Sequence, residues 1–207
     1  EEAWLDKIQK TNANLVMIDT REGIDLRPIE DHHHPAGSPR RGTKEMVMDP
    51  HIWLSPRLAK QQAETICRTL IALDPTRKKE YQRNYQLFVE DLEDVDREIR
   101  SVMSRVRGRK FLVFHPAWGY FADEYGLEQI SIEAEGKEPT AKQLAQLIEQ
   151  ARQNDIKVIF VQSQFNTKPA ETIARAIGGQ IVQLDPLAED YLDNLILMAK
   201  AIAAGAR

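Results

Sequence analysis

The sequence predicts an α/β fold in which helices cover both faces of a parallel sheet. Two observations support this prediction. After residue 108, short apolar runs of strand length alternate with stretches of helical period, which is typical of parallel strands joined by crossover helices. Before that point, residues 76–107 keep one amphipathic pattern in steps of three and four with no glycine or proline inside, and this pattern predicts a single long helix.

The composition indicates a folded globular protein and excludes several classes. The 207 residues include 28 basic and 32 acidic side chains, so the formal net charge is −4. A protein that binds nucleic acid without sequence preference needs a basic surplus, so we expect no nucleic-acid partner. No apolar run is long enough to span a membrane. The lone Cys67 excludes an internal disulfide and a multi-cysteine zinc site, and we expect it in the core.

The front of the chain predicts few elements around a long loop. A short helix is expected around residues 4–10 and an apolar strand over 15–18. Residues 30–45 are rich in His, Pro, Gly and Arg and have no period, so we expect a surface loop there. The chain begins at Glu1 with no leader-like stretch, and we expect a mature or truncated product.

Two helices are expected in the middle of the chain. The first begins at Ser55-Pro56, with Ser as its N-cap and Pro at its first position, and ends at Asp74-Pro75. Its buried side is assigned to Leu58, Ile66, Leu70 and Leu73. The second covers 76–107 and is roughly 45 Å long at about 1.5 Å per residue. Its apolar positions are Tyr81, Tyr85, Phe88, Leu92, Val95, Ile99, Val102 and Val106. A short coiled coil is the alternative, but a helix lying along its own domain better fits a pattern followed at once by a buried strand.

The second half of the chain predicts four strands and four helices. The strands are expected over 111–114, 129–132, 158–161 and 180–184. The helices are expected over 118–126, 141–154, 168–177 and 189–203. Thr140 and Gln143 fit a capping box, and Gly178-Gly179 fits a helix end. Such alternation predicts a parallel sheet.

Polar side chains with metal-binding chemistry follow two of the predicted strands. His115 comes directly after Phe114 and Asp185 directly after Leu184, and a proline follows each of them. Ligands of parallel α/β sheets gather beyond the carboxyl ends of the strands. A third candidate, His51, lies just before the capped helix. Two imidazoles and a carboxylate suit zinc, although position alone leaves open whether each histidine is a ligand or a structural residue.

Two further clusters are candidates for a role in metal binding or catalysis. His32-His33-His34, in the loop over 30–45, is a candidate accessory metal-scavenging site, with a plain solvated loop as the alternative. Glu133, Glu135 and Glu138 are expected to form a solvated acidic rim rather than a general acid–base pair. No catalytic residues are assigned, because the sequence has no glycine-rich phosphate loop, nucleophile elbow or His-Glu-x-x-His pair.

Two aromatic residues follow His115 closely. Trp118 and Tyr120 are candidates for lining a cleft beside it. The alternative is that both fill core space. The sequence alone does not separate the two interpretations.

Three motifs in this chain are similar to a known set. Residues 49–56 read Asp-Pro-His-Ile-Trp-Leu-Ser-Pro, residues 114–121 read Phe-His-Pro-Ala-Trp-Gly-Tyr-Phe before Tyr125-Gly126-Leu127, and residues 184–187 read Leu-Asp-Pro-Leu. In this order and spacing they resemble the metal-binding solute-binding proteins of ABC transporters, particularly the zinc-uptake group. The resemblance runs from about Trp4 to the end of the chain.

The resemblance implies two lobes with parallel sheets flanked by helices, joined by one long rigid helix, with a metal in the cleft between them. It divides the chain into the remainder of an N-terminal lobe (1–75), a linking helix (76–107) and a C-terminal lobe (108–207). By motif, His51 would be the ligand from the first lobe, and His115 and Asp185 the ligands from the second. A further histidine ligand is implied upstream of Glu1.

The resemblance also favours one metal. In manganese-preferring relatives the position of His115 usually holds Glu, so the histidine here favours Zn²⁺, with Mn²⁺ as the alternative. Gln162 stands where relatives often carry an acidic residue, and this is a small departure. The three-residue His32–34 stretch is a remnant of the histidine-rich loop typical of zinc members.

The implied function is capture without turnover. An extracytoplasmic or periplasmic component of an ABC importer would bind zinc and deliver it to a membrane permease; we expect a monomer, with anchoring through an upstream segment left open. The alternatives are a manganese- or iron-binding member of the same fold and an adhesin-like lipoprotein. A zinc-dependent hydrolase is the alternative from another class, and it would need Glu133 or Glu135 as its general base.

Overall fold

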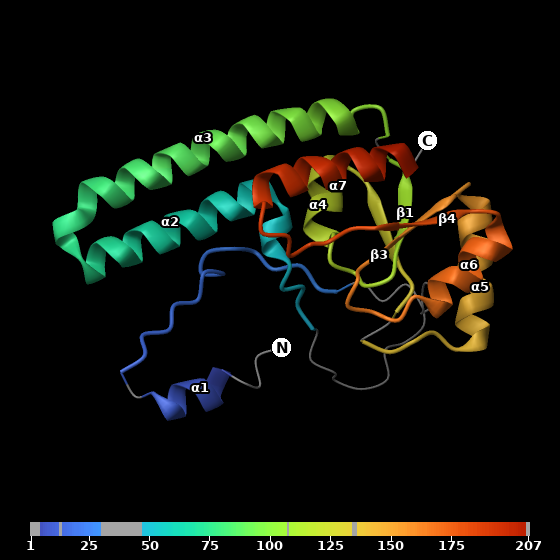
Figure 1. Ribbon diagram of the computed structural model, residues 1–207, viewed down its shortest axis with the longest axis horizontal. Coiled ribbons are helices and arrows are strands. Elements are labelled where there is room, and N and C mark those ends of the chain that lie inside the picture. The colour runs from blue at the N-terminus through green and yellow to red at the C-terminus, as the bar shows by residue number, and fades with distance from the viewer. Residues whose placement is uncertain (1–4, 13, 30–46, 107, 134–135, 206–207) are drawn as a thin grey trace.

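The structure is a computed structural model that describes residues 5–12, 14–29, 47–106, 108–133 and 136–205. Two long helices, α2 (Pro56–Leu73) and α3 (Lys78–Met103), run side by side as a hairpin, and a small sheet with its own helices lies beyond one end of it (Figure 1). The α/β fold class predicted from the sequence is confirmed. Among the described residues, no helix combines the length and the apolar character needed to cross a membrane.

The front of the chain contributes little regular structure within the described ranges. Helix α1 (Leu5–Thr11) lies where a short helix is predicted. The strand predicted over 15–18 is wrong, because these residues form no strand and are exposed, Val16 to 61%. An apolar run becomes a strand only when a neighbour takes its backbone hydrogen bonds, and no described segment does so here. The loop predicted over 30–45, with His32, His33 and His34, lies outside the described residues.

The segments on either side of that loop meet. Pro28 and Met48 form an antiparallel bridge, and the backbone N–H of Asp49 donates to the carbonyl oxygen of Arg27 at 2.8 Å. This pairing places Arg27 beside Asp49, two residues before the candidate ligand His51. A short 3₁₀ helix, η1 (Ile52–Leu54), then leads into α2.

Helix α2 begins and ends where the sequence predicts. The side-chain oxygen of Ser55 caps it by accepting the backbone N–H of Leu58 at 3.2 Å. Cys67 is buried, as expected. The predicted buried side is partly wrong, because three of its members are 47%, 38% and 62% exposed: Ile66, Leu70 and Leu73. Helix α2 packs on α3, and one neighbouring helix covers only one stripe of its surface.

Helix α3 is unbroken, as predicted, but ends at Met103 rather than near residue 107. A short 3₁₀ helix, η2 (Pro75–Arg77), joins it to α2. Its apolar positions fall into two groups. Those toward its C-terminal end are buried: Leu92, Val95, Ile99 and Met103. Those toward its start are only half-buried: Tyr81, Tyr85 and Phe88. The buried group packs with residues of α7 (Tyr191–Gly205), so α3 contacts α2 and α7 at once.

The sheet has four parallel strands in the order β2-β1-β3-β4. The strands are β1 (Lys110–Val113), β2 (Glu128–Ser131), β3 (Val158–Val161) and β4 (Gln180–Gln183). Each lies within one residue of its predicted range. Helices α4 (Gly119–Tyr125), α5 (Ala141–Gln153) and α6 (Lys168–Ile177) connect them. The capping box of Thr140 and Gln143 is confirmed, and so is the helix end at Gly178, which has a φ of 65°.

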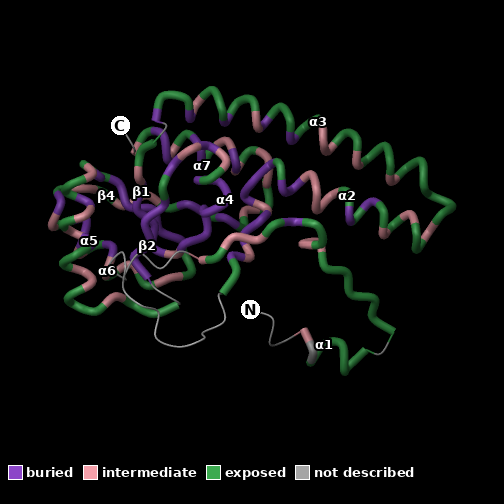
Figure 2. The backbone as a smooth tube through the Cα atoms, turned by 180° about the vertical axis from the view of Figure 1, so that it is seen from behind, coloured by how far each residue is buried: buried purple, intermediate pink, exposed green. Residues whose placement is uncertain are grey.

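Alternating residues of the strands build a core on each face of the sheet. Phe111 and Val113 of β1 pack in the same cluster as residues of α3, α4 and α7. Leu112 packs on the other face with residues of α5 and α6. Figure 2 shows the buried residues concentrated around the sheet, whereas the far ends of α2 and α3 are largely exposed. The sheet is thus the most deeply buried part of the described molecule, and its carboxyl edge is the place where side chains can be held for a ligand.

The strand order also marks a position on that edge. The chain passes from β1 to β2 on one side and later returns to β3 on the other side of β1. Ligand sites of open α/β sheets lie where the strand order reverses in this way. His115, which follows β1, stands at this point.

Candidate metal centre

His51 is held by a buried carboxylate two residues before it. The Oδ1 atom of Asp49 lies 2.7 Å from the ring Nδ1 of His51 and also accepts the backbone N–H of His51 at 3.0 Å. Asp49 is 1% exposed and His51 is 6% exposed. A carboxylate accepts only, so the proton sits on Nδ1 and the lone pair of the ring is on Nε2. The Asp-Pro-His sequence therefore fixes both the orientation and the tautomer of this imidazole.

His115 is held in the same way by a residue from another strand. Its Nδ1 is hydrogen-bonded to the Oε1 of Glu133, which follows β2 at the same edge of the sheet and is 4% exposed. The ring also stacks on Phe165, which comes from the loop after β3. The lone pair of His115 is thus on Nε2 as well.

The two Nε2 atoms face one another at 3.3 Å, with the ring planes at 76°. Two lone pairs that point at each other repel unless a proton or a metal cation lies between them. In a tetrahedral site with Zn–N bonds of about 2.0–2.1 Å, two nitrogen ligands are about 3.3 Å apart. Carboxylate–histidine pairs of this kind are the usual support for histidine ligands of metals. The arrangement therefore suits two adjacent ligands of one zinc ion.

The third predicted ligand, Asp185, is not in contact with either histidine. It follows β4, its side chain is exposed, and its Oδ1 accepts the backbone N–H of Leu187 at 2.9 Å. The next residue, Pro186, is close to the site, because its carbonyl oxygen accepts the indole N–H of Trp53 at 2.9 Å. The Trp53 ring lies 5.3 Å from that of His51. Within the described ranges, no three His, Cys, Asp or Glu side chains are gathered closely enough to hold a metal.

The aromatic candidates lie behind the site rather than on the surface of a cleft. Trp118 is fully buried in the core, where its indole N–H points at the sulfur of Met198 at 3.3 Å, so the structure contradicts its assignment as a cleft-lining residue. Tyr120 is 6% exposed and donates its hydroxyl to the carbonyl oxygen of Asp49 at 2.9 Å. Tyr120 thus supports the segment that carries His51 instead of facing a cleft.

The prediction that Glu133 belongs to a solvated rim is wrong. It is buried and bonded to His115, while Glu135 lies outside the described residues. Glu138 accepts from Asn166 at 2.7 Å and lies at the surface. Sequence reasoning also missed Asp49 and Phe165. A signal was present for Glu133, because carboxylates that follow neighbouring parallel strands meet at one edge, and for Asp49, because an acidic residue two places before a histidine can reach its Nδ1.

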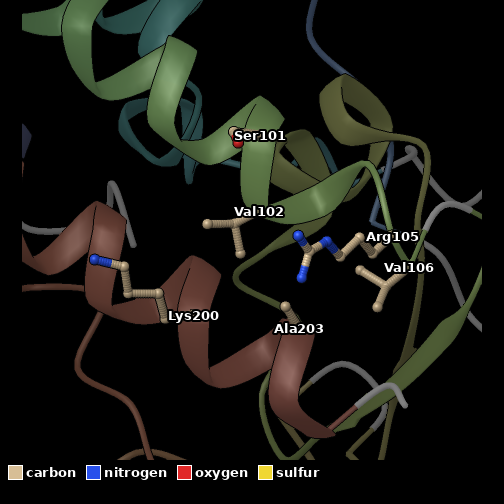
Figure 3. Close-up of a pocket in the computed structure, with 6 residues that line it drawn as sticks. All are labelled: Ser101, Val102, Arg105, Val106, Lys200 and Ala203. Atoms are coloured by element: carbon tan, nitrogen blue, oxygen red, sulfur yellow. The ribbon is translucent and has the colours of Figure 1, made fainter.

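The described surface also holds a cavity of about 320 Å³ between the end of α3 and α7 (Figure 3). It is lined by Ser101, Val102, Arg105, Val106, Lys200 and Ala203. Lys200 is paired with Glu98 at 2.7 Å. The cavity contains no metal-ligating side chain and none of the residues described above, so it is separate from the histidine pair.

The parallel α/β sheet, the helical hairpin and the two carboxylate-supported imidazoles fit the class of metal-binding solute-binding proteins. The family is shown by comparison with known proteins. The chain belongs to the family described as zinc-uptake complex component A, periplasmic, whose model matches residues 1–205.

Two curated relatives give the scale of the similarity. The chain is 31% identical over 190 residues to the high-affinity zinc uptake system protein ZnuA of Bacillus subtilis, covering 90% of this chain and 60% of that protein. It is 30% identical over 199 residues to the zinc-binding protein AdcA of Streptococcus pyogenes serotype M3, covering 90% of this chain and 39% of that protein. The chain thus spans less than two thirds of the length of these relatives.

Solved structures show the same fold over the whole chain. A crystal structure of ZnuA is 42% identical with a TM-score of 0.89, and the match covers 100% of this chain and 76% of that one. A ZnuA deletion mutant with zinc bound is 44% identical with a TM-score of 0.86, covering 100% and 75%. A mutant of the laminin-binding adhesin Lmb from Streptococcus agalactiae is 25% identical with a TM-score of 0.84, covering 100% and 77%.

Proposed function

We propose that this chain is the zinc-capturing component of an ABC importer and that it binds the ion between His51 and His115. The observation that carries the proposal is the 3.3 Å separation of the two Nε2 atoms, each belonging to a ring whose Nδ1 is held by a carboxylate. This spacing is the edge between two ligands of a tetrahedral zinc ion. The family and its zinc-uptake relatives support the same assignment.

Asp185 is proposed as a third ligand. Its side chain is exposed, so it can change rotamer. The loop that carries it is bonded through Pro186 to Trp53, which lies two residues after His51. A carboxylate would complement the two neutral imidazoles and offset part of the charge of the ion. A fourth position would be filled by water or by the further histidine that the resemblance places upstream of Glu1.

We also propose where this chain acts and which partner it serves. The relatives include a zinc-binding lipoprotein AdcA of Streptococcus pneumoniae, and we infer a periplasmic or other extracytoplasmic place for this chain. A membrane permease would receive the ion, and the chain would act as a monomer. The proposed division of the chain is the remainder of an N-terminal lobe (1–75), a linking helix (76–107) and a C-terminal lobe (108–207). A second candidate is an adhesin-like role outside the cytoplasm. The structurally similar protein Lmb from Streptococcus agalactiae is called a laminin-binding adhesin.

The test is a thermal melt of chelator-stripped protein with no metal, with zinc or with manganese. A ligand at 100 times its dissociation constant adds about 2.7 kcal/mol to the free energy of unfolding, which is roughly 5–10 °C for a chain of this size. We expect the zinc shift to exceed the manganese shift and to be lost in His115→Ala. A larger manganese shift would make this a manganese-binding member of the fold.

A matched control uses the other histidines of the chain. Replacing His32, His33 and His34 together by alanine removes three imidazoles that are proposed as an accessory scavenging loop. This variant should keep the full zinc shift and lose only additional, weaker binding in a titration. A zinc shift that survives His115→Ala but disappears in the triple variant would contradict the site between His51 and His115.

A zinc-dependent hydrolase is poorly supported by the geometry. Glu133, its candidate general base, is already bonded to the Nδ1 of His115, so it is not free to activate a water. Ester and phosphoester substrates offered to the zinc-loaded protein should show no turnover above free zinc.

A further inference from the structure

Arg27 lies between the segment that carries His51 and the start of α4. Its Nη1 is 3.7 Å from the Oδ2 of Asp49, and its Nε is 3.0 Å from the Oδ2 of Asp123 on α4. Its side chain is only 13% exposed. Tyr120, also on α4, accepts the backbone N–H of Arg27 at 3.0 Å and donates to the carbonyl oxygen of Asp49 at 2.9 Å. Two segments far apart in sequence are therefore joined at this point.

The two oxygens of Asp49 have separate partners. Oδ1 bonds to the ring and the backbone of His51, and Oδ2 faces the guanidinium of Arg27. A carboxylate that is 1% exposed has lost its water and needs charged or polar partners to stay in place. Because Arg27 occupies the far oxygen, the near oxygen stays turned toward His51.

Gly119, the first residue of α4, leaves the space that Arg27 fills. A Cβ at this position would lie 1.5 Å from the Nη1 of Arg27 and 2.7 Å from the Oδ2 of Asp49. Any side chain here would displace the guanidinium of Arg27 and also crowd the carboxylate of Asp49, so the two groups could not keep their present places. The end of an arginine side chain is flexible, so Arg27 can move aside and the fold can persist. The ion pair between Arg27 and Asp49 would then be broken.

We propose that Arg27 is a positioning residue for the metal ligand His51, and that Gly119 is the residue whose missing side chain admits it. The guanidinium orients Asp49, and Asp49 sets the proton on Nδ1 and the direction of Nε2. This inference rests on the proposed function, since it requires that His51 binds zinc. It adds residues on two further segments to the machinery of the site.

The first test replaces the charge and keeps most of the stem, in Arg27→Met. Zinc affinity, measured by competition with a chromophoric chelator, should fall about tenfold, because losing an outer partner of a ligand typically costs about 10–100-fold in metal affinity. Arg97→Met is the control, because Arg97 forms an exposed ion pair with Asp94 on α3 and should leave zinc affinity unchanged.

The second test is Gly119→Ala, made in the wild-type and the Arg27→Met backgrounds. Alanine favours the helix more than glycine does, so the unfolding temperature should change little. Zinc affinity should nevertheless fall about tenfold in the wild-type background and less than about threefold in the Arg27→Met background. Such coupling between the two substitutions is what a shared route through Asp49 predicts.

A readout without metal separates positioning from general stability. In metal-free protein labelled with ¹⁵N-histidine, NMR detects the proton on the Nδ1 of His51. The chemical shift of this proton should change in Arg27→Met and Gly119→Ala and stay the same in Arg97→Met. If both variants lose unfolding temperature but keep zinc affinity and this proton signal, the inference is overturned and Arg27 is only structural. If instead the protein holds zinc equally well after His51→Ala, the proposed function itself fails, and this inference fails with it.

Discussion

The ring of His115 stacks on the ring of Phe165, with centroids 4.9 Å apart and planes inclined by 17°. Phe165 reaches this position from the loop after β3, where its backbone N–H donates to the carbonyl oxygen of Gln162 at 3.3 Å. The phenyl ring covers one face of the imidazole, limits its rotation and keeps water from that side. Phe165 also packs against the core that α5 and α6 form on their face of the sheet, so this core extends up to the proposed ligand His115.

Replacing Phe165 by alanine should therefore speed the release of zinc. We expect a loss of about three- to tenfold in affinity, seen mainly in the dissociation rate, because a freed ring and entering water weaken an otherwise preorganised ligand. Stopped-flow transfer of zinc to a chelator measures that rate. Phe165→Tyr keeps the stacked face and should release zinc at the wild-type rate; equal rates for alanine and tyrosine would show that the stack has no role.

The carboxylates behind the two histidines should matter in parallel. Asp49→Asn and Glu133→Gln keep the shape of the partner but remove its charge, and each should lower zinc affinity by about 10–100-fold. Chelator competition measures both. The isosteric change Glu138→Gln, at the exposed residue of the same loop, is the control. A loss for only one of the two carboxylates would mean that the other histidine is not a ligand.

Glu124 gives the stability of the protein a dependence on pH. Burial raises the pKa of its carboxyl, although its hydrogen bond from Ser55 acts against this. A carboxyl with a raised pKa in the folded state contributes stability below its unfolded value, about 4.3, and loses it as pH rises through the folded value. Glu124→Gln should therefore be more stable than wild type at pH 7 and equal to it near pH 4.

Urea unfolding at the two pH values measures this difference. A shift of one full pKa unit corresponds to about 1.4 kcal/mol, and the gain in the free energy of unfolding should be a fraction of this. The reason is that nearby water and Arg100 screen the charge of Glu124. The Nη2 of Arg100 lies 3.4 Å from the Oε1 of Glu124. A gain of the same size at both pH values would instead point to better packing of the amide.

The capping box of α5 offers a prediction independent of the metal. Thr140 caps the helix through Gln143, and Thr140→Ala should lower the free energy of unfolding by about 1 kcal/mol. For a domain of this size that is about 2–4 °C in unfolding temperature. Zinc affinity should be unchanged, because the hydrogen bonds of the capping box join Thr140 to Gln143 and not to either histidine. Thr140→Ser retains the hydroxyl and should unfold at the wild-type temperature.

The sheet could be predicted closely because its signals are local. Strands β1 and β3 are short, mainly apolar runs, as is typical of buried parallel strands, and β2 and β4 mix apolar with polar residues but lie between clear turn and helix signals. The same local logic misplaced residues 15–18 and the face of α2 that carries Leu73. In both cases the pattern says that a surface is apolar, but only the packing partner decides whether it is buried.

The sequence alone was enough to predict the two histidines proposed as ligands, but not the residues that hold them in place. The two histidines stand at a strand end and before a capped helix, and these positions can be read from the chain. The bond from Glu133 to His115 depends on β2 lying beside β1, and the stack with Phe165 depends on a loop that follows β3. The position of Arg27 depends on the absence of a side chain at Gly119. Such relationships come from tertiary structure, which a single sequence does not specify residue by residue.

The way α3 is shared between α2 and α7 has a calorimetric consequence. Because one unbroken helix packs on both, we expect little closure about a hinge among the described residues when an ion arrives. Closure of a hinge buries apolar surface, and such burial appears as a negative heat-capacity change on binding. Zinc binding to this protein should therefore release heat that varies little with temperature, as expected for an ion entering a site that is already built.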